Sequence, residues 1–433
     1  MQPNPGYYQA QPHPYPSPPP FPQRPPPPKR DPEKTKRTIG LVLYVLGMLG
    51  GLALLVLVFL LPPLFEDDPV FEYQAMALGA MLALPPLLVY LWVPWIVDRY
   101  DPEPLWALLA VLAWGAIAAC GFSAVINTSV HGMGDAMFGR GAGSVLGACV
   151  SAPLVEEAFK GLGVAGMYWF VRREFDGVVD GVIYAAFAAL GFAAVENIIY
   201  YGDAARDEVI TGQEGLLVGT VVIRGILAPW GHPLYTSMTG LGFGIARETD
   251  KPWLRWAAPI GGYLCAAFLH SVWNTSATLS NMLLFLMLPL WLLFVLGFAG
   301  LVLWLVSRKG RIIRQHLEDE VLMGTMTVQE VDLVCSPFAS WKATFSWGGA
   351  PARKFVAAAA RLALSKWHTG RAARSRSATV SADFVIPLRQ ELGQLRAQME
   401  RALGRALPRP QPWKPGQQAP FRQVAPPWWM QRR

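Results

Sequence analysis

Long apolar segments, separated by short polar loops, run through the middle of the chain. Apolar runs near or above the ~20 residues that cross a bilayer recur at residues 39–61, 74–97, 104–126, 146–170, 179–201, 215–246, 254–276 and 282–306. A segment inside lipid must satisfy its own backbone hydrogen bonds, which favours the helix. The pattern therefore predicts an all-α polytopic membrane protein with about eight transmembrane helices.

The sixth apolar segment is too long for one straight span. It contains Pro229, Trp230, Gly231, His232 and Pro233 near its middle. Proline removes a backbone donor and kinks a helix, which membrane proteins tolerate where the segment faces protein or a wet cavity. We expect a broken or kinked helix at this point.

Polar regions flank the transmembrane domain, which we place at residues 39–306. Residues 1–38 are crowded with proline and predict a disordered cytoplasmic arm, because such a composition cannot bury a core. Residues 307–405 have apolar positions at helical spacing and predict a cytoplasmic helical region, whereas residues 406–433 predict a disordered tail. The arm or the C-terminal region could bind a cytoplasmic partner.

Composition and charge agree with the membrane class. The chain is 53% hydrophobic and 15% charged, against about 25% charged residues in a soluble domain. Lys and Arg gather in alternate loops, whereas Asp and Glu gather in the opposite ones, a positive-inside pattern that predicts both termini in the cytoplasm. The net charge of +7 is explained by this topology, so we expect the lipid bilayer and no nucleic acid as a partner.

Five charged side chains interrupt the apolar segments. Each costs roughly 2.5 to 3.5 kcal/mol at a helix centre, so five cost about 12 to 17 kcal/mol, comparable with the stability of a whole domain. Such a cost indicates function. The charged groups are Glu156, Glu157, Lys160, Glu196 and Arg224, and they are accompanied by Asn197, His232, Thr236, His270 and Asn274.

Four helices bring an acid or an imidazole to one depth. At ~1.5 Å per residue, Glu156, Glu196, His232 and His270 all lie roughly 21 to 26 Å from the cytoplasmic ends of their helices. This level is the outer half of the membrane. The pattern predicts one site there, built by four segments of the chain.

Helical spacing also predicts which groups share a face. Residues four apart lie in line, so Lys160 shares a face with Glu156, Thr236 with His232 and Asn274 with His270. The adjacent glutamates are ~100° apart. One should face the reacting centre and the other should pair with a cation such as Lys160 or Arg224, and the sequence leaves open which is which.

Carboxylates and imidazoles in a site of low dielectric suit amide hydrolysis, which needs a base for water and a stabiliser for the oxyanion. If a divalent metal such as zinc is used, Glu196, His232 and His270 are candidate ligands, with Glu156 or Glu157 as the base. A metal-free mechanism stays open. The chain contains neither HExxH nor GxSxG, which excludes standard zincins and a serine nucleophile elbow.

Five ordered motifs resemble the PrsW family of bacterial intramembrane proteases. They are DRYDPEP at 98–104, EExxK at 156–160, FDGVVDGVIYAAFAALGFAAVEN at 175–197, HxxxT at 232–236 and HxxWN at 270–274, and together they cover about residues 95–280. The resemblance implies a multi-pass protease of the bacterial plasma membrane, distantly similar to CAAX-processing and bacteriocin-processing proteases. The implied substrate is a single-span membrane protein, such as an anti-sigma factor, cut near its extracytoplasmic side.

The resemblance also implies roles for individual residues. Glu156 and Glu157 match the glutamates considered essential in the family, and Glu196, His232 and His270 match its remaining active-site positions. The family is usually labelled metalloprotease, whereas its CAAX-processing relatives are argued to be metal-free glutamate proteases. We count Asn274 with the catalytic set, and the expected supporting residues are Lys160, Asn197, Arg224 and Thr236.

Two other classes of function compete with a protease. Buried Glu, Lys and Arg also line ion pathways, so a proton- or cation-coupled transporter is an alternative. Against it, the sequence shows no inverted repeat, and its polar groups lie in one layer rather than along a path. A membrane scaffold that recruits partners through its C-terminal region is a further, non-enzymatic reading.

Overall fold

The structure, a computed structural model, describes residues 32–100, 102–336, 338–374 and 383–413. Every element within these ranges is a helix, as the apolar pattern predicts. The last residues of the predicted N-terminal arm already belong to the first helix, which begins at Pro32. The rest of that arm and most of the predicted tail lie outside the described residues.

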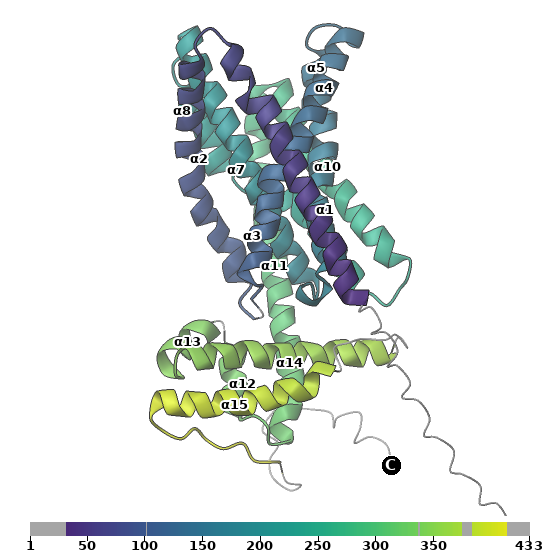
Figure 1. The fold of residues 1–433 in the computed structure, drawn as a ribbon, viewed down its shortest axis with the longest axis vertical. Helices are drawn as coiled ribbons and strands as arrows, with labels where there is room; N and C mark the ends of the chain where they lie inside the picture. The colour runs from purple at the N-terminus through teal and green to yellow at the C-terminus, as the bar shows by residue number, and fades with distance from the viewer. Residues whose placement is uncertain (1–31, 101, 337, 375–382, 414–433) are drawn as a thin grey trace, which may run out of the picture.

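The elements follow one another as a series of helices joined by short turns (Figure 1). The α-helices are α1 (Pro32–Leu55), α2 (Pro69–Val97), α3 (Leu105–Ala113), α4 (Cys120–Phe138), α5 (Ala142–Leu146), α6 (Ala152–Phe170), α7 (Val178–Thr211), α8 (Leu216–Val221), α9 (Gly231–Glu248), α10 (Leu254–Leu279), α11 (Asn281–Leu322), α12 (Val328–Val334), α13 (Ala339–Ser346), α14 (Ala350–Arg374) and α15 (Val385–Leu403). Wider π-helical turns form η1 (Val56–Leu60), η3 (Trp114–Ala119), η4 (Gly147–Ser151) and η6 (Val222–Leu227), and 3₁₀ turns form η2 (Pro62–Phe65) and η5 (Arg172–Glu174).

Six helical stretches of the described chain are long and apolar enough to cross a membrane. They are Lys34–Phe65, Pro69–Val97, Leu105–Phe138, Ala142–Phe170, Val178–Thr211 and Met282–Leu322. The remaining two predicted spans, 215–246 and 254–276, are also helical and stand in the same bundle as α8, α9 and α10 (Figure 1). The chain is therefore a multi-helix membrane protein, and the count of eight spans stays a prediction.

The predicted break in the sixth segment is present. The π-helical turn η6 ends at Leu227, a short turn follows, and α9 begins at Gly231. Both His232 and Thr236 then fall in the first turns of one regular helix. The break therefore starts a new helix immediately before the predicted site.

Helix α7 forms the centre of the bundle. Of its most apolar 18-residue window, 89% is buried inside the protein. Small residues let other helices approach closely: a methyl group added to Gly181 would lie 2.2 Å from the carbonyl oxygen of Gly240, and one on Gly191 would lie 2.0 Å from that of Leu112. Such contacts are typical of membrane helices, where close packing drives association. This packing fixes α7 against α3 and α9.

The last helices form a separate layer beneath the bundle. Figure 1 shows α11 leaving the bundle and entering this layer, where α14 and α15 run across its axis. Ion pairs join the two parts, including Lys309 to Asp180 at 2.9 Å and Arg308 to Glu248 at 2.8 Å. We call the end of the bundle that meets this layer the C-terminal side and the opposite end the distal side.

Candidate active site

Segments from η4 to α11 line a polar cavity of about 320 Å³. Glu156 of α6, Glu196 of α7, His232 of α9 and His270 of α10 all face it. The structure thus brings together the four groups that helical depth placed at one level. Residues near the distal ends of the helices, including Ala148, Thr278 and Leu284, complete the wall, so the cavity lies toward the distal side.

Glu157 is fixed by three side chains and is fully buried. Lys160 Nζ lies 2.6 Å from Glu157 Oε1, Thr236 donates its hydroxyl to Oε2 at 2.7 Å, and His270 Nδ1 is 3.2 Å from Oε1. Lys160 itself is buried and also lies over the ring of Phe192. Glu157 therefore has the role of the charge partner, and it joins α6 to α9 and α10.

Glu156, the residue immediately before Glu157, has a different environment. Its Oε1 accepts a hydrogen bond of 3.2 Å from Asn127, whose own Oδ1 accepts one from Ser151. Its Oε2 is buried and has no hydrogen-bond partner among the described residues, with Lys160 Nζ at 3.8 Å and His270 Nε2 at 4.0 Å. Glu156 lines the cavity, as expected for one of two residues ~100° apart on a helix.

Glu196 is held by an arginine and an imidazole. Arg224 Nη2 lies 2.5 Å from Glu196 Oε2, and its Nε donates to Asn197 Oδ1 at 2.8 Å. His232 Nε2 lies 2.7 Å from the same carboxylate oxygen. Because one oxygen already meets two donors, Glu196 serves to anchor Arg224 and His232.

The contacts define the proton positions of the two histidines. Lys160 can only donate, so the 3.0 Å contact makes His232 Nδ1 an acceptor and leaves the proton on Nε2, which faces Glu196. For His270, the contact with Glu157 places the proton on Nδ1. The Nε2 lone pair of a neutral His270 then points toward Glu156.

Two side chains of α10 hold the turn that precedes the glutamates. Pro153 lacks an N–H group, so the preceding π-helical turn η4 lacks one backbone donor. Asn274 donates to the carbonyl oxygen of Ala148 at 2.9 Å and Ser271 to that of Cys149 at 2.5 Å. Asn274 thus fixes the backbone that orients Glu156.

Glu156, His232 and His270 form a group that could hold a metal. Each offers one ligand atom, and these atoms lie within 4.8 Å of one another. The unpartnered oxygen of Glu156 suits a ligand, and an imidazole that donates its other N–H to a carboxylate, as His270 does, is the usual state of a metal-binding histidine. The carboxylate in this candidate metal site is therefore Glu156, whereas the sequence analysis proposed Glu196 as the carboxylate ligand.

Sequence reasoning did not single out Asn127, Ser151 or Ser271, all of which contact the site. Asn127 stands within an apolar run, which is a usable signal, because a polar amide inside a span is usually bonded across helices. The two serines give no such signal, since small hydroxyl residues are common in membrane helices.

A helical membrane bundle with carboxylates and imidazoles around a cavity can support amide hydrolysis inside a membrane. A family model described as PrsW family intramembrane metalloprotease matches residues 103–305. Protease PrsW of Geobacillus kaustophilus (strain HTA426) is 31% identical over 184 residues, which are 42% of this chain and 71% of the relative. The chain therefore belongs to the PrsW family and is an intramembrane protease.

Two further relatives agree with this assignment. Protease PrsW of Bacillus subtilis (strain 168) is 25% identical over 226 residues, which are 50% of this chain and 87% of the relative. Protease PrsW of Clostridioides difficile (strain 630) is 33% identical over 131 residues, which are 29% of this chain and 52% of the relative. No solved structure matches the chain. The family assignment favours a protease over the transporter and scaffold alternatives.

Proposed function

We propose that this protease cuts a single-span membrane protein near the extracytoplasmic side, with Glu156 as the base that activates water. One observation carries the role of Glu156. The site holds three carboxylates but two fixed cations, and Lys160 lies closest to Glu157 while Arg224 lies closest to Glu196. Glu156 is the carboxylate left over: the residue lines the cavity, and its Oε2 is buried with no hydrogen-bond partner among the described residues.

In the proposed reaction, Glu156 Oε2 takes a proton from a water molecule as the water oxygen attacks the scissile carbonyl carbon. The same carboxyl group then gives the proton to the departing amide nitrogen, so the peptide bond breaks with no net change in the protease. The guanidinium of Arg224 lines the same cavity and can stabilise the developing oxyanion. His232 donates its N–H to Glu196, so its role is to position that carboxylate.

The same residues suit a metal-assisted form of the reaction. Glu156, His232 and His270 would hold a divalent cation such as zinc, and His232 would exchange its contact with Lys160 or Glu196 for it. Such an ion supplies a Lewis acid for the carbonyl group and strengthens a bound water as a nucleophile. Metal analysis of purified wild type beside His270→Ala tests this: stoichiometric zinc lost in the variant supports it, and active, metal-free wild type contradicts it.

We also propose that the distal side is extracytoplasmic and that both termini lie in the cytoplasm of a bacterium. The positive-inside pattern supports this orientation, and the cavity lies toward the distal side. A membrane-anchored regulator, of the anti-sigma-factor kind, is then the expected class of substrate.

The test compares new protein N-termini in membranes of cells that express the wild type or Glu156→Gln. We expect new termini within a few residues of the extracytoplasmic end of single-span proteins in the wild type, and their loss in the variant. Termini that gather at the cytoplasmic end, or that persist in Glu156→Gln, would contradict the proposal.

A further inference from the structure

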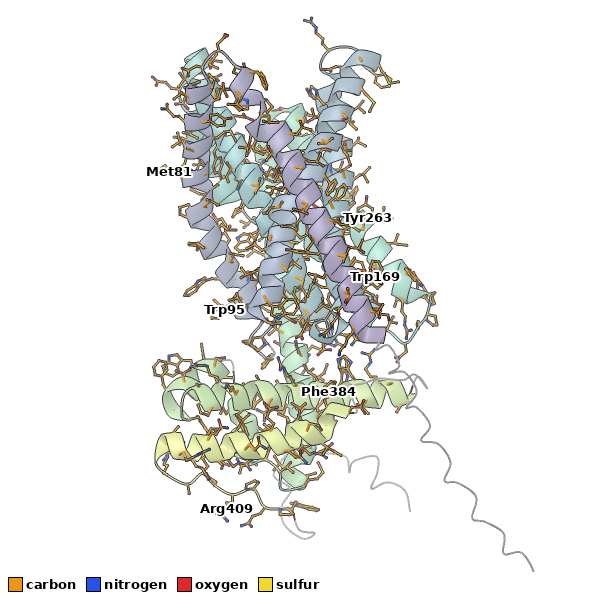
Figure 2. All side chains as sticks on the ribbon, in the orientation of Figure 1. Met81, Trp95, Trp169, Tyr263, Phe384 and Arg409 are labelled. Carbon is orange, nitrogen blue, oxygen red and sulfur yellow. The ribbon has the colours of Figure 1, made fainter. Side chains whose placement is uncertain are left out.

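A second cavity, of about 570 Å³, lies between α6 and α10, with part of α9 as its floor. It lies on a different face of α6 from the active-site cavity, because Glu157 lines the groove and Glu156, ~100° away on the helix, lines the active-site cavity. Figure 2 shows Trp169 and Tyr263, both residues of its wall, on one flank of the bundle, with Trp169 nearer the C-terminal side. We call this cavity the α6–α10 groove.

The wall of the groove is apolar, with a cation at its C-terminal end. The side chain of Arg255, in the first turn of α10, makes no hydrogen bond or ion pair with any described residue. Trp256, next to Arg255, is 67% exposed, and Trp169 is 46% exposed. Tryptophan and arginine together are typical of the level of the lipid headgroups.

One buried polar atom inside the groove also lacks a partner. Thr239 is 2% exposed and lines the groove, and its hydroxyl has no hydrogen-bond partner among the described residues. A buried hydroxyl without a partner costs ~1 to 3 kcal/mol. A ligand with an apolar body and an acceptor group would satisfy it.

The width of the groove distinguishes two candidate ligands, a hydrocarbon chain and a protein helix. From Glu157 to Trp169 the wall of α6 is roughly 18 Å long, so a volume of about 570 Å³ gives a mean cross-section of roughly 30 Å². A helix with a diameter of ~10 Å occupies roughly 80 Å². An extended hydrocarbon chain, whose neighbours approach to about 4 Å, occupies roughly 20 Å² and fits.

From these observations we propose that the α6–α10 groove binds one anionic phospholipid. Arg255 contacts the phosphate group, an acyl chain lies along Ala158, Gly161 and Leu162, and an ester oxygen accepts from Thr239. Basic pockets between membrane helices on the cytoplasmic side bind such headgroups elsewhere. The bound chain covers the side of Glu157 that lines the groove.

Native mass spectrometry of the full chain in detergent, titrated with phosphatidylglycerol or phosphatidylcholine, tests the proposal without any cleavage assay. A failure of the proposed protease mechanism would therefore leave this result untouched. We expect one saturable phosphatidylglycerol site that phosphatidylcholine fills more weakly. Arg255→Gln should weaken that site about five-fold, and Arg255→Glu should weaken it further.

Matched variants separate the groove from the general surface. Lys251→Gln removes an exposed cation from the loop just before α10, and Ala257→Phe adds an aromatic ring to an exposed position of α10 outside the groove. Both variants should bind phosphatidylglycerol as the wild type does. Ala158→Phe, which fills the groove, should abolish the site. Because Arg255 is exposed, its variants keep the test valid if Ala158→Phe does not fold.

Two results would overturn the proposal. One is equal binding of both lipids to the wild type, with no change in Arg255→Gln. The other is competition between phosphatidylglycerol and a single-span helical peptide for the same site, which would make the groove a docking site for a protein helix.

Discussion

Replacing the two adjacent glutamates by glutamine, one at a time, should separate a structural role of Glu157 from a catalytic role of Glu156. Glu157 is fully buried and bonds to Lys160, Thr236 and His270. Glu157→Gln leaves the buried ammonium of Lys160 without its closest charge, and breaking a buried pair in this way costs ~3 to 5 kcal/mol. We therefore expect a large loss in the free energy of unfolding.

Glu156→Gln should leave stability within ~1 kcal/mol of the wild type, because one of its oxygens has no hydrogen-bond partner and the other meets an amide that glutamine can also bind. Its rate of cleavage should fall by ~10² to 10⁴, the usual contribution of a general base. Denaturant titration in mixed micelles, followed by tryptophan fluorescence, gives the free energy of unfolding. Cleavage in proteoliposomes gives the rate.

The double variant Glu157→Gln/Lys160→Met is the control. It removes both charges of the pair, so it should recover most of the stability that Glu157→Gln alone loses. The reasoning fails if Glu156→Gln is as unstable as Glu157→Gln, or if Lys160→Met recovers nothing.

Three further changes follow from other contacts. Asn274→Ala should cost ~1 to 3 kcal/mol of unfolding free energy in the same titration, because the carbonyl group of Ala148 loses its donor; Asn274→Asp, which cannot donate, should not restore it. Asn127→Leu should lower kcat and change KM much less in steady-state cleavage, because the Glu156 carboxylate loses its hydrogen bond and can rotate. Equal effects on kcat and KM would contradict a positioning role for Asn127. Burial and two nearby arginines lower the pKa of His368 to about 3. Because the unfolded chain takes up a proton at its usual pKa of ~6.5 and the folded protein does not, the free energy of unfolding should fall by about 2 kcal/mol between pH 7 and pH 5. His368→Leu should remove that part of the pH dependence.

Much of the fold follows from the apolar pattern, because a bilayer demands long apolar helices and leaves few alternatives. The break before Gly231 follows from its flanking prolines, and the common depth of Glu156, Glu196, His232 and His270 follows from a fixed rise per residue. These quantities depend on one helix at a time. For that reason the sequence alone predicts them.

The rotation of each helix about its own axis cannot be predicted from the sequence in this way. The π-helical turns η3, η4 and η6 each add a residue to a turn, and η4 lies directly before the helix that carries Glu156. An added residue shifts every later side chain by ~100°, so regular periodicity cannot say which glutamate faces the cavity. The partners of Glu196 depend equally on how α7 meets η6 and α9, which only the packed structure shows.

The charges that make this bundle costly to insert are mostly neutralised by one another. Arg224 offsets Glu196 and Lys160 offsets Glu157, and each pair is supported by a histidine that takes no charge of its own in the tautomers described above. Pairing at these distances recovers much of the insertion cost of four of the five groups. The uncompensated cost therefore falls mainly on Glu156, the group that the proposed reaction needs to be free. A bundle selected only for stability would have an apolar residue at that position.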